Sequence, residues 1–296
     1  MAVGGEGERK MLRPLLASLV LLLASAAPNL MPLGGNIDGI ADYSWTLPFV
    51  NVVKQSRFWG SAGQPWDGNC TVGADGWPSQ PDFGNVFVTS SPSGPSILGT
   101  WLMSFEGNAT ILIPALMRGS SIQNQTYNAA TDTTTAALVI TPNADSCNCI
   151  MFSFAGASTR ASGPGIKALQ ILQPGYALSQ ANDFSTPLLT LLARLDVLRF
   201  MDWAHTNGNL IVSWASRSLP TAYSFAPEGA TVPWEVCFDL INTLQKDAWI
   251  NIPAHADDDY VLQLAKLAKA HLAPGLNLYL EFSNEVVSLN WRPPLF

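Results

Sequence analysis

The sequence is poor in charge, and poorest in basic residues. Lysine and arginine together number 15, aspartate and glutamate number 22, and the formal net charge is -7. Proteins that bind nucleic acid need clustered basic residues to neutralise phosphates. The composition therefore predicts no nucleic-acid partner. Hydrophobic residues make up 48% of the chain, which indicates a folded protein with a sizeable core.

Signature motifs of several enzyme classes are also missing. The chain has no Gly-x-Ser-x-Gly elbow, no His-Glu-x-x-His motif and no glycine-rich phosphate loop. Cys147 and Cys149 form a Cys-x-Cys step without further metal ligands nearby in the sequence. The acidic run at residues 257–259 precedes a predicted helix, whose positive end explains the run better than a bound cation does. We expect neither a metal nor a cofactor.

Cysteine is scarce, with four residues in the chain. Cys147 and Cys149 lie two apart on an alternating stretch, so both side chains face one side of a predicted sheet. Cys237 falls inside a helical pattern and is expected to be a buried free thiol. We therefore predict a structural disulfide between Cys70 and either Cys147 or Cys149.

Long hydrophobic runs are missing except near the N-terminus. Basic residues precede an apolar run at residues 15–27, which is shorter than the roughly 20 apolar residues that a membrane-spanning helix needs. Small residues around Ala26 resemble a cleavage point. We interpret residues 1–26 as a signal peptide, with an uncleaved anchor as the alternative. After its removal we expect no stable membrane span.

Three Asn-x-Ser/Thr tripeptides fit a secretory route. They begin at Asn69, Asn108 and Asn124, in surroundings rich in glycine, serine and threonine. Such tripeptides also occur by chance. Together with the N-terminal segment they predict a glycosylated protein that is secreted, extracellular or in a cell wall.

The two halves of the chain differ in pattern. Residues 34–160 contain short strand-like stretches separated by turn-forming clusters, which is typical of an all-β sandwich or jelly roll. From residue 165 to 287 strand patterns alternate with helical ones, which is typical of βαβ units with a parallel sheet. In this second half we expect four strands, at IKALQIL, DVLRFMDW, AWINIPAH and NLYLEF.

Polar and aromatic residues follow the strands of the second half. Ligands of parallel α/β sheets gather at the carboxyl ends of strands, where the sequence places Arg199, Trp203, His255, Asn284 and Glu285. This set suits a polyhydroxylated ligand, which needs hydrogen bonds and aromatic faces. Each residue also has a structural alternative: an ion pair of Arg199 with a nearby aspartate, a core position for Trp203, a helix cap for His255, and an ordinary turn at Asn284–Glu285.

A resemblance supports the carbohydrate interpretation. The stretches LRFMDW, AWINIPAHADDDYV and LYLEFSNEV, in that order, resemble a family of secreted, carbohydrate-active-like proteins. That family joins a β-sandwich to a barrel similar to glycoside hydrolase clan A. The resemblance implies that Glu285 is the general acid/base and that Asn284 binds a sugar hydroxyl. Arg199 matches an arginine near the nucleophile, and His255 loosely matches a third-strand histidine.

The resemblance also implies the fold and its extent. We expect a sandwich followed by the first half of a (β/α)8 barrel, with a divergent tail at residues 288–296. A retaining glycosidase needs a nucleophile ~5–5.5 Å from the acid, and in that clan the nucleophile lies on a seventh strand. With four strands counted here, we expect a truncated chain that is inactive alone.

Three functions remain open. The first is acid/base hydrolysis of a β-linked polysaccharide, with Glu285 as proton donor. The second is non-catalytic glycan binding, for which the tryptophans of the first half could form a stacking platform: Trp45, Trp59, Trp66, Trp77 and Trp101. The third is a structural extracellular or cell-wall protein.

Overall fold

The computed structural model describes residues 31–89, 96–142, 147–178, 183–227 and 229–286. Within these ranges the chain forms three four-stranded sheets and three α-helices. Two of the sheets are antiparallel and the third is parallel. Among the described residues, strand is therefore more abundant than helix.

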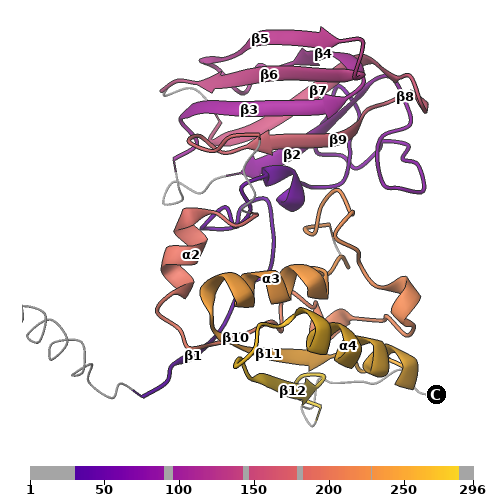
Figure 1. The fold of residues 1–296 in the computed structure, drawn as a ribbon. Helices are drawn as coiled ribbons and strands as arrows, with labels where there is room; N and C mark the ends of the chain where they lie inside the picture. The colour runs from indigo at the N-terminus through magenta and orange to yellow at the C-terminus, as the bar shows by residue number, and fades with distance from the viewer. Residues whose placement is uncertain (1–30, 90–95, 143–146, 179–182, 228, 287–296) are drawn as a thin grey trace, which may run out of the picture. The chain divides into compact units, whose positions relative to one another are not determined.

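The antiparallel sheets occupy the first part of the chain (Figure 1). One has the order β2-β7-β4, with β8 also paired to β7; its strands are β2 (Phe83–Thr89), β4 (Asn108–Leu112), β7 (Cys149–Thr159) and β8 (Gly163–Pro164). The other has the order β5-β6-β3-β9; its strands are β3 (Gly99–Glu106), β5 (Ser120–Asn128), β6 (Thr133–Ile140) and β9 (Lys167–Leu172).

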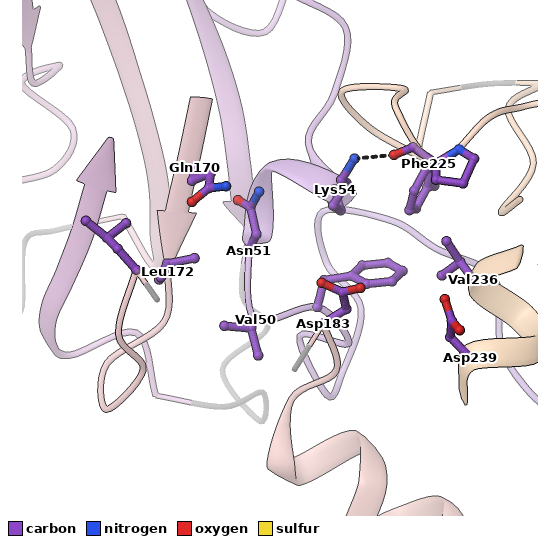
Figure 2. Close-up of a pocket in the computed structure, with 12 residues that line it drawn as sticks. Val50, Asn51, Lys54, Gln170, Leu172, Asp183, Phe225, Val236 and Asp239 are labelled. Carbon is purple, nitrogen blue, oxygen red and sulfur yellow. Dashed lines mark hydrogen bonds between the residues drawn. The ribbon is translucent and has the colours of Figure 1, made fainter. Parts of the chain in front are cut away.

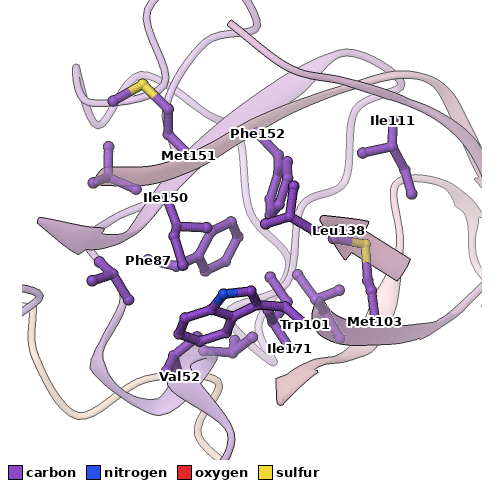
Figure 3. Close-up of a cluster of buried hydrophobic side chains, with 14 of the residues drawn as sticks. Val52, Phe87, Trp101, Met103, Ile111, Leu138, Ile150, Met151, Phe152 and Ile171 are labelled. Carbon is purple, nitrogen blue, oxygen red and sulfur yellow. The ribbon is translucent and has the colours of Figure 1, made fainter. Parts of the chain in front are cut away.

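Alternating burial explains how these two sheets share a core. In β3 and β6 every second side chain is buried, as expected when one sheet face packs and the other meets solvent. Trp101 and Leu138 from one sheet and Phe152 from the other belong to one buried cluster (Figure 3). The indole N–H of Trp101 donates to the Ile97 carbonyl at 2.9 Å, so burial leaves this polar group satisfied.

The parallel sheet has the order β1-β10-β11-β12. Its strands are β1 (Gly34–Asn36), β10 (Val197–Arg199), β11 (Asp247–Ile252) and β12 (Leu278–Phe282). The indigo strand β1 lies beside the orange strand β10 in Figure 1, although the antiparallel strands separate the two in the sequence. The antiparallel sheets are thus inserted between the first and second strands of the parallel sheet.

Three α-helices accompany these later strands: α2 (Thr186–Leu192), α3 (Trp234–Leu244) and α4 (Asp258–His271). Apolar residues of α3 and α4 and one face of β10 and β11 form a second buried cluster. The indole N–H of Trp234 donates to the hydroxyl of Tyr260 at 2.8 Å and joins the two helices inside that cluster. One face of β10 and β11 is therefore part of the core, whereas Leu280 and Phe282 on the same face of β12 are exposed.

The predicted half barrel is wrong. The stretch at 167–172, expected to begin the barrel, is β9 and pairs antiparallel with β3. From Ala168 to Ile171 its side chains alternate between exposed and buried, which suits the edge of a half-covered antiparallel sheet better than a parallel strand buried on both faces. The parallel sheet instead takes its first strand from residues 34–36 and stays open. Three strands from the second half and one short strand from far upstream do not make half a barrel.

The predicted pairing of Cys70 is also wrong. A disulfide joins Cys147 to Cys149, whose Cα atoms lie 5.2 Å apart, and Cys70 and Cys237 are free thiols. The reason is local: side chains two apart on a strand face the same side, and this Cα separation is within disulfide range. Cys237 is fully buried, as predicted.

Two predicted segments, the signal peptide at 1–26 and the tail at 288–296, lie outside the described residues. Among the described residues no helix has both the length and the apolar character needed to cross a membrane.

Candidate functional site

The open face of the parallel sheet carries one row of residues across all four strands. Asn36 is paired in register with Arg199, Arg199 with Trp249, and Trp249 with Tyr279. Residues paired in this way lie side by side on the same face of a sheet. The row therefore places a guanidinium between an amide and two neighbouring aromatic rings.

Strand alternation assigns these residues to the face opposite the helices. In β11, Ala248 and Ile250 are buried in the core shared with α3 and α4, whereas Trp249 between them is 39% exposed. In β12, Tyr279 is 48% exposed. Two adjacent strands thus offer a pair of accessible aromatic side chains, which core packing does not require.

Glu281 is the centre of a hydrogen-bond network on this face. Its Oε2 accepts from Arg199 Nε at 3.0 Å and from Arg199 Nη2 at 2.7 Å. The same oxygen accepts from Trp249 Nε1 at 2.9 Å and from Asn251 Nδ2 at 2.7 Å. The guanidinium also lies 5.2 Å from the centre of the Trp249 ring. These contacts fix the orientations of the carboxylate and the indole together.

Arg199 extends this network to the end of β12. Its Nη2 donates to Asn284 Oδ1 at 2.8 Å, and Asn284 Nδ2 donates to Asn207 Oδ1 at 3.0 Å. The structure therefore brings together two of the predicted site residues, Arg199 and Asn284. Glu285 follows Asn284 directly, is exposed and has a positive φ of 45°. No hydrogen bond or ion pair joins its carboxylate to any other described residue.

The other two predicted binding residues lie elsewhere. Trp203 is 2% exposed, and its indole N–H donates to the Asp38 carbonyl at 3.0 Å. This position favours the core alternative for Trp203. His255 is half-buried beyond the end of β11, and the described residues make no bond that joins it to Arg199 or Asn284. The helix cap foreseen for His255 is instead supplied by Asp257.

Arg199 does not form an ion pair with a nearby aspartate, the structural alternative considered from the sequence. Its carboxylate partner is Glu281, not Asp196 or Asp202. Asp202 instead accepts from Asn36 Nδ2 at 2.5 Å, at the outer edge of the same sheet. The guanidinium therefore pairs with a residue of another strand on the open face, and not with an aspartate close to it in the sequence.

Comparison of the chain with family models, curated proteins and solved structures finds no match. The site is therefore argued from its own geometry.

This geometry matches the chemistry of a polyhydroxylated ligand. Accessible aromatic rings stack on the apolar faces of sugar rings, and oriented carboxylate and amide groups bond to hydroxyls. Within the described ranges, no group of three or more His, Cys, Asp and Glu side chains is placed to hold a metal ion.

The tryptophan platform considered for the first half divides into two sets. Trp59 and Trp101 are at most 2% exposed and belong to the core between the antiparallel sheets. Trp45 and Trp66 are exposed, and Trp77 packs partly against the core. The five tryptophans therefore do not act as one surface.

A separate cavity of about 260 Å³ lies beside the 3-10 helix η1 (Val52–Gln55) (Figure 2). Lys54 Nζ donates to the carbonyls of Pro220 at 2.9 Å and Ala222 at 2.6 Å. Burial lowers the pKa of Lys54 to about 8, against the opposing effect of Asp183. Burial, with the nearby Asp239, raises the pKa of Asp183. The two carbonyl bonds give Lys54 a structural function, that of holding the 220–222 loop to η1.

The three predicted glycosylation positions share an exposed location. Asn69 lies in a loop, Asn108 begins β4 and Asn124 lies within β5, and all three side chains are accessible. Exposure is a requirement for modification, and these positions meet it.

The sequence interpretation missed Glu281, Trp249, Asn251 and Tyr279. A signal for them was available in the alternation of the strands. In LNLYLEF the leucines and Phe282 occupy one face, and Tyr279 and Glu281 occupy the other. A glutamate and a tyrosine on the same face of an apolar strand indicate a functional or solvent-facing surface.

Proposed function

We propose that this chain is a carbohydrate-binding protein whose ligand lies on the open face of the parallel sheet. The observation that carries the proposal is the pair of accessible rings, Trp249 and Tyr279, beside the carboxylate of Glu281. Since the Trp249 indole N–H is bonded to Glu281, the ring is held in one orientation before a ligand arrives. Such preorganisation reduces the entropy lost on binding.

Titration with β-linked gluco-, xylo- and manno-oligosaccharides tests this proposal. We expect Trp249→Ala to weaken binding about 10-fold or more, because a stacking aromatic side chain contributes on the order of 1–3 kcal/mol. Trp45→Ala is the matched control, since Trp45 is an exposed tryptophan outside the parallel sheet. Failure of the unmodified protein to bind any oligosaccharide would refute the proposal.

A second candidate function is hydrolysis, with Glu285 as proton donor. Its exposed carboxylate directly follows Asn284, the Asn-Glu step on which the glycoside hydrolase-like resemblance rests, and Asn284 bonds to Arg199. The decisive comparison is between cleavage and binding of the same β-linked oligosaccharide. Glu285→Gln should abolish cleavage and leave binding within about 3-fold, because the amide keeps the shape but loses the acidic proton. Binding without cleavage by the unmodified protein would leave the non-catalytic function.

We also propose that the protein enters a eukaryotic secretory route and is glycosylated. Exposure of Asn69, Asn108 and Asn124, together with the Cys147–Cys149 disulfide, supports this proposal. Treatment of the secreted protein with an N-glycosidase should increase its electrophoretic mobility. A triple Asn→Gln variant with unchanged mobility would argue against it.

A further inference from the structure

We infer that Glu281 is a ligand-binding residue that makes this face select neutral sugars over acidic ones. The inference rests on the proposed carbohydrate function and adds the class of sugar and the residue that chooses it. It is carried by an asymmetry between the two oxygens of a single carboxylate.

The two oxygens of Glu281 have different environments. Four N–H donors converge on Oε2, which exceeds the two lone pairs that one carboxylate oxygen offers. No hydrogen bond from a described residue reaches Oε1, although the side chain is 28% exposed. Oε2 therefore anchors the side chain, and Oε1 is the atom left to accept a proton donor from a ligand.

The donors that hold Oε2 come from two strands of the sheet, and the acceptor belongs to a third. Arg199 belongs to β10, Trp249 and Asn251 belong to β11, and Glu281 belongs to β12. Asn251 is fully buried, and its Nδ2 also donates to the Ser283 carbonyl at 2.7 Å. The buried Asn251 and its neighbours thus fix the carboxylate, so Oε1 keeps one position on the open face.

The position of Oε1 beside the two aromatic side chains indicates which ligand group it would bind. Trp249 bonds to the same carboxylate, and Tyr279 is paired in register with Trp249. A sugar ring stacked on these aromatic side chains would direct its hydroxyls along the sheet towards Oε1. A hydroxyl group donates to a carboxylate oxygen with a charge-assisted bond.

The charge balance of this face works against acidic sugars. Arg199 is the cation of the row, and four of its five N–H groups are already bonded, to Glu281, Asn284 and the sulfur of Met201. A uronate or sulfate group would meet the carboxylates of Glu281 and Glu285 without a free guanidinium fork to bind it. Like charges brought together in a partly desolvated site repel each other.

The test compares neutral and acidic oligosaccharides of equal length, by calorimetry on the full chain. We expect the unmodified protein to bind the neutral oligosaccharide at least 10-fold more tightly than one rich in uronate. Glu281→Gln should weaken the neutral ligand about 10- to 100-fold, as expected for loss of a hydrogen bond to a charged group. The same variant should reduce the discrimination against uronate. Glu106→Gln, on β3 of an antiparallel sheet, is the matched control.

Each outcome separates the inference from the proposed function. If the unmodified protein binds no oligosaccharide, the proposed function fails. If it binds neutral sugars and Glu281→Gln binds them equally well, the inference is overturned and the proposed function stands. Tighter binding of uronate by the unmodified protein would also overturn the inference.

A measurement on the unmodified protein covers the case in which Glu281→Gln does not fold. Raising the salt concentration from 0.05 M to 0.5 M should reduce the preference for neutral over acidic ligands, because salt screens the repulsion. A preference that does not change with salt would contradict a charge-based selection.

Discussion

Cys70 and Cys149 touch the same buried cluster, yet their chemistry differs at the scale of the single residue. Cys149 is bonded to Cys147, whereas Cys70 is a free, partly exposed thiol. Burial, together with the nearby carboxylate of Asp67, raises the pKa of Cys70 to about 11. The thiolate is the reactive form of cysteine, so Cys70 is accessible to reagents but reacts slowly.

The raised pKa predicts slow alkylation of Cys70. At pH 8 we expect iodoacetamide to modify it roughly 100-fold more slowly than a thiol of the unfolded chain, because two pKa units reduce the thiolate fraction a hundredfold. Peptide mass mapping over time measures the rate. The buried Cys237 serves as internal control and should react only on unfolding. Recovery of Cys70 in a disulfide-linked peptide would contradict the pairing described.

At the scale of elements, α4 depends on a defined N-cap. Asp257 Oδ1 accepts from the Tyr260 backbone N–H at 2.7 Å, and Asp258 and Asp259 lie in the first turn. Asp257→Ala should lower the free energy of unfolding by about 0.5–2 kcal/mol, since the cap is lost. Asp257→Ser retains a capping oxygen and should recover most of that loss. Urea unfolding followed by circular dichroism measures both, and equal losses in the two variants would exclude the capping explanation.

Elements with strong local signals were predicted from the sequence. α3 and α4 have helical periodicity, and α4 also has acidic residues at its start and basic residues at its end. β5 was missed because it is polar and largely exposed on both faces, so it has no apolar alternation. β9 was recognised as a strand but assigned to the wrong sheet, because its partner β3 lies about 60 residues upstream. Pairing across such distances leaves no local signature.

The candidate site follows the same rule. Arg199 and Asn284 were found because strand ends are marked by the change from apolar to polar residues. Glu281 was missed because it lies within β12 and not at a strand end; alternation places it on the face of Tyr279, but its bond to Arg199 appears only in the structure. That contact spans 82 positions in the sequence. Residue type indicates which groups are available, and the fold decides which of them meet.

At the scale of the whole molecule, Lys54 connects the inserted strands to the later part of the chain. The pKa of Lys54 is about 8 in the folded protein and 10.5 as its ordinary value. Between these values the unfolded chain binds more protons, so the contribution of Lys54 to the free energy of unfolding rises with pH. Below pH 8 both states hold the proton, and the cost of burying the charge is present in full.

Urea unfolding between pH 7 and pH 10 tests this expectation. The free energy of unfolding of the unmodified protein, measured relative to that of Lys54→Met, should increase as pH rises from 8 to 10. Using this difference removes the opposite contribution of Cys70 and Tyr223, whose pKa values are raised. A difference that stays constant with pH would show that the carbonyls of Pro220 and Ala222 compensate fully for burial.

The insertion between β1 and β10 also sets an order for folding. In an unstructured chain, pairing β1 with β10 closes a loop of about 160 residues. Once the sandwich has formed, Val50 N–H bonds to the Asp183 carbonyl, and the effective loop falls to about 28 residues. Loop-closure entropy grows as about (3/2)RT ln n, so prior folding of the inserted strands saves about 1.5 kcal/mol. In newly synthesised chains the two antiparallel sheets should therefore fold first. β1 should remain unpaired until residues 197–199, which form β10, have emerged from the ribosome.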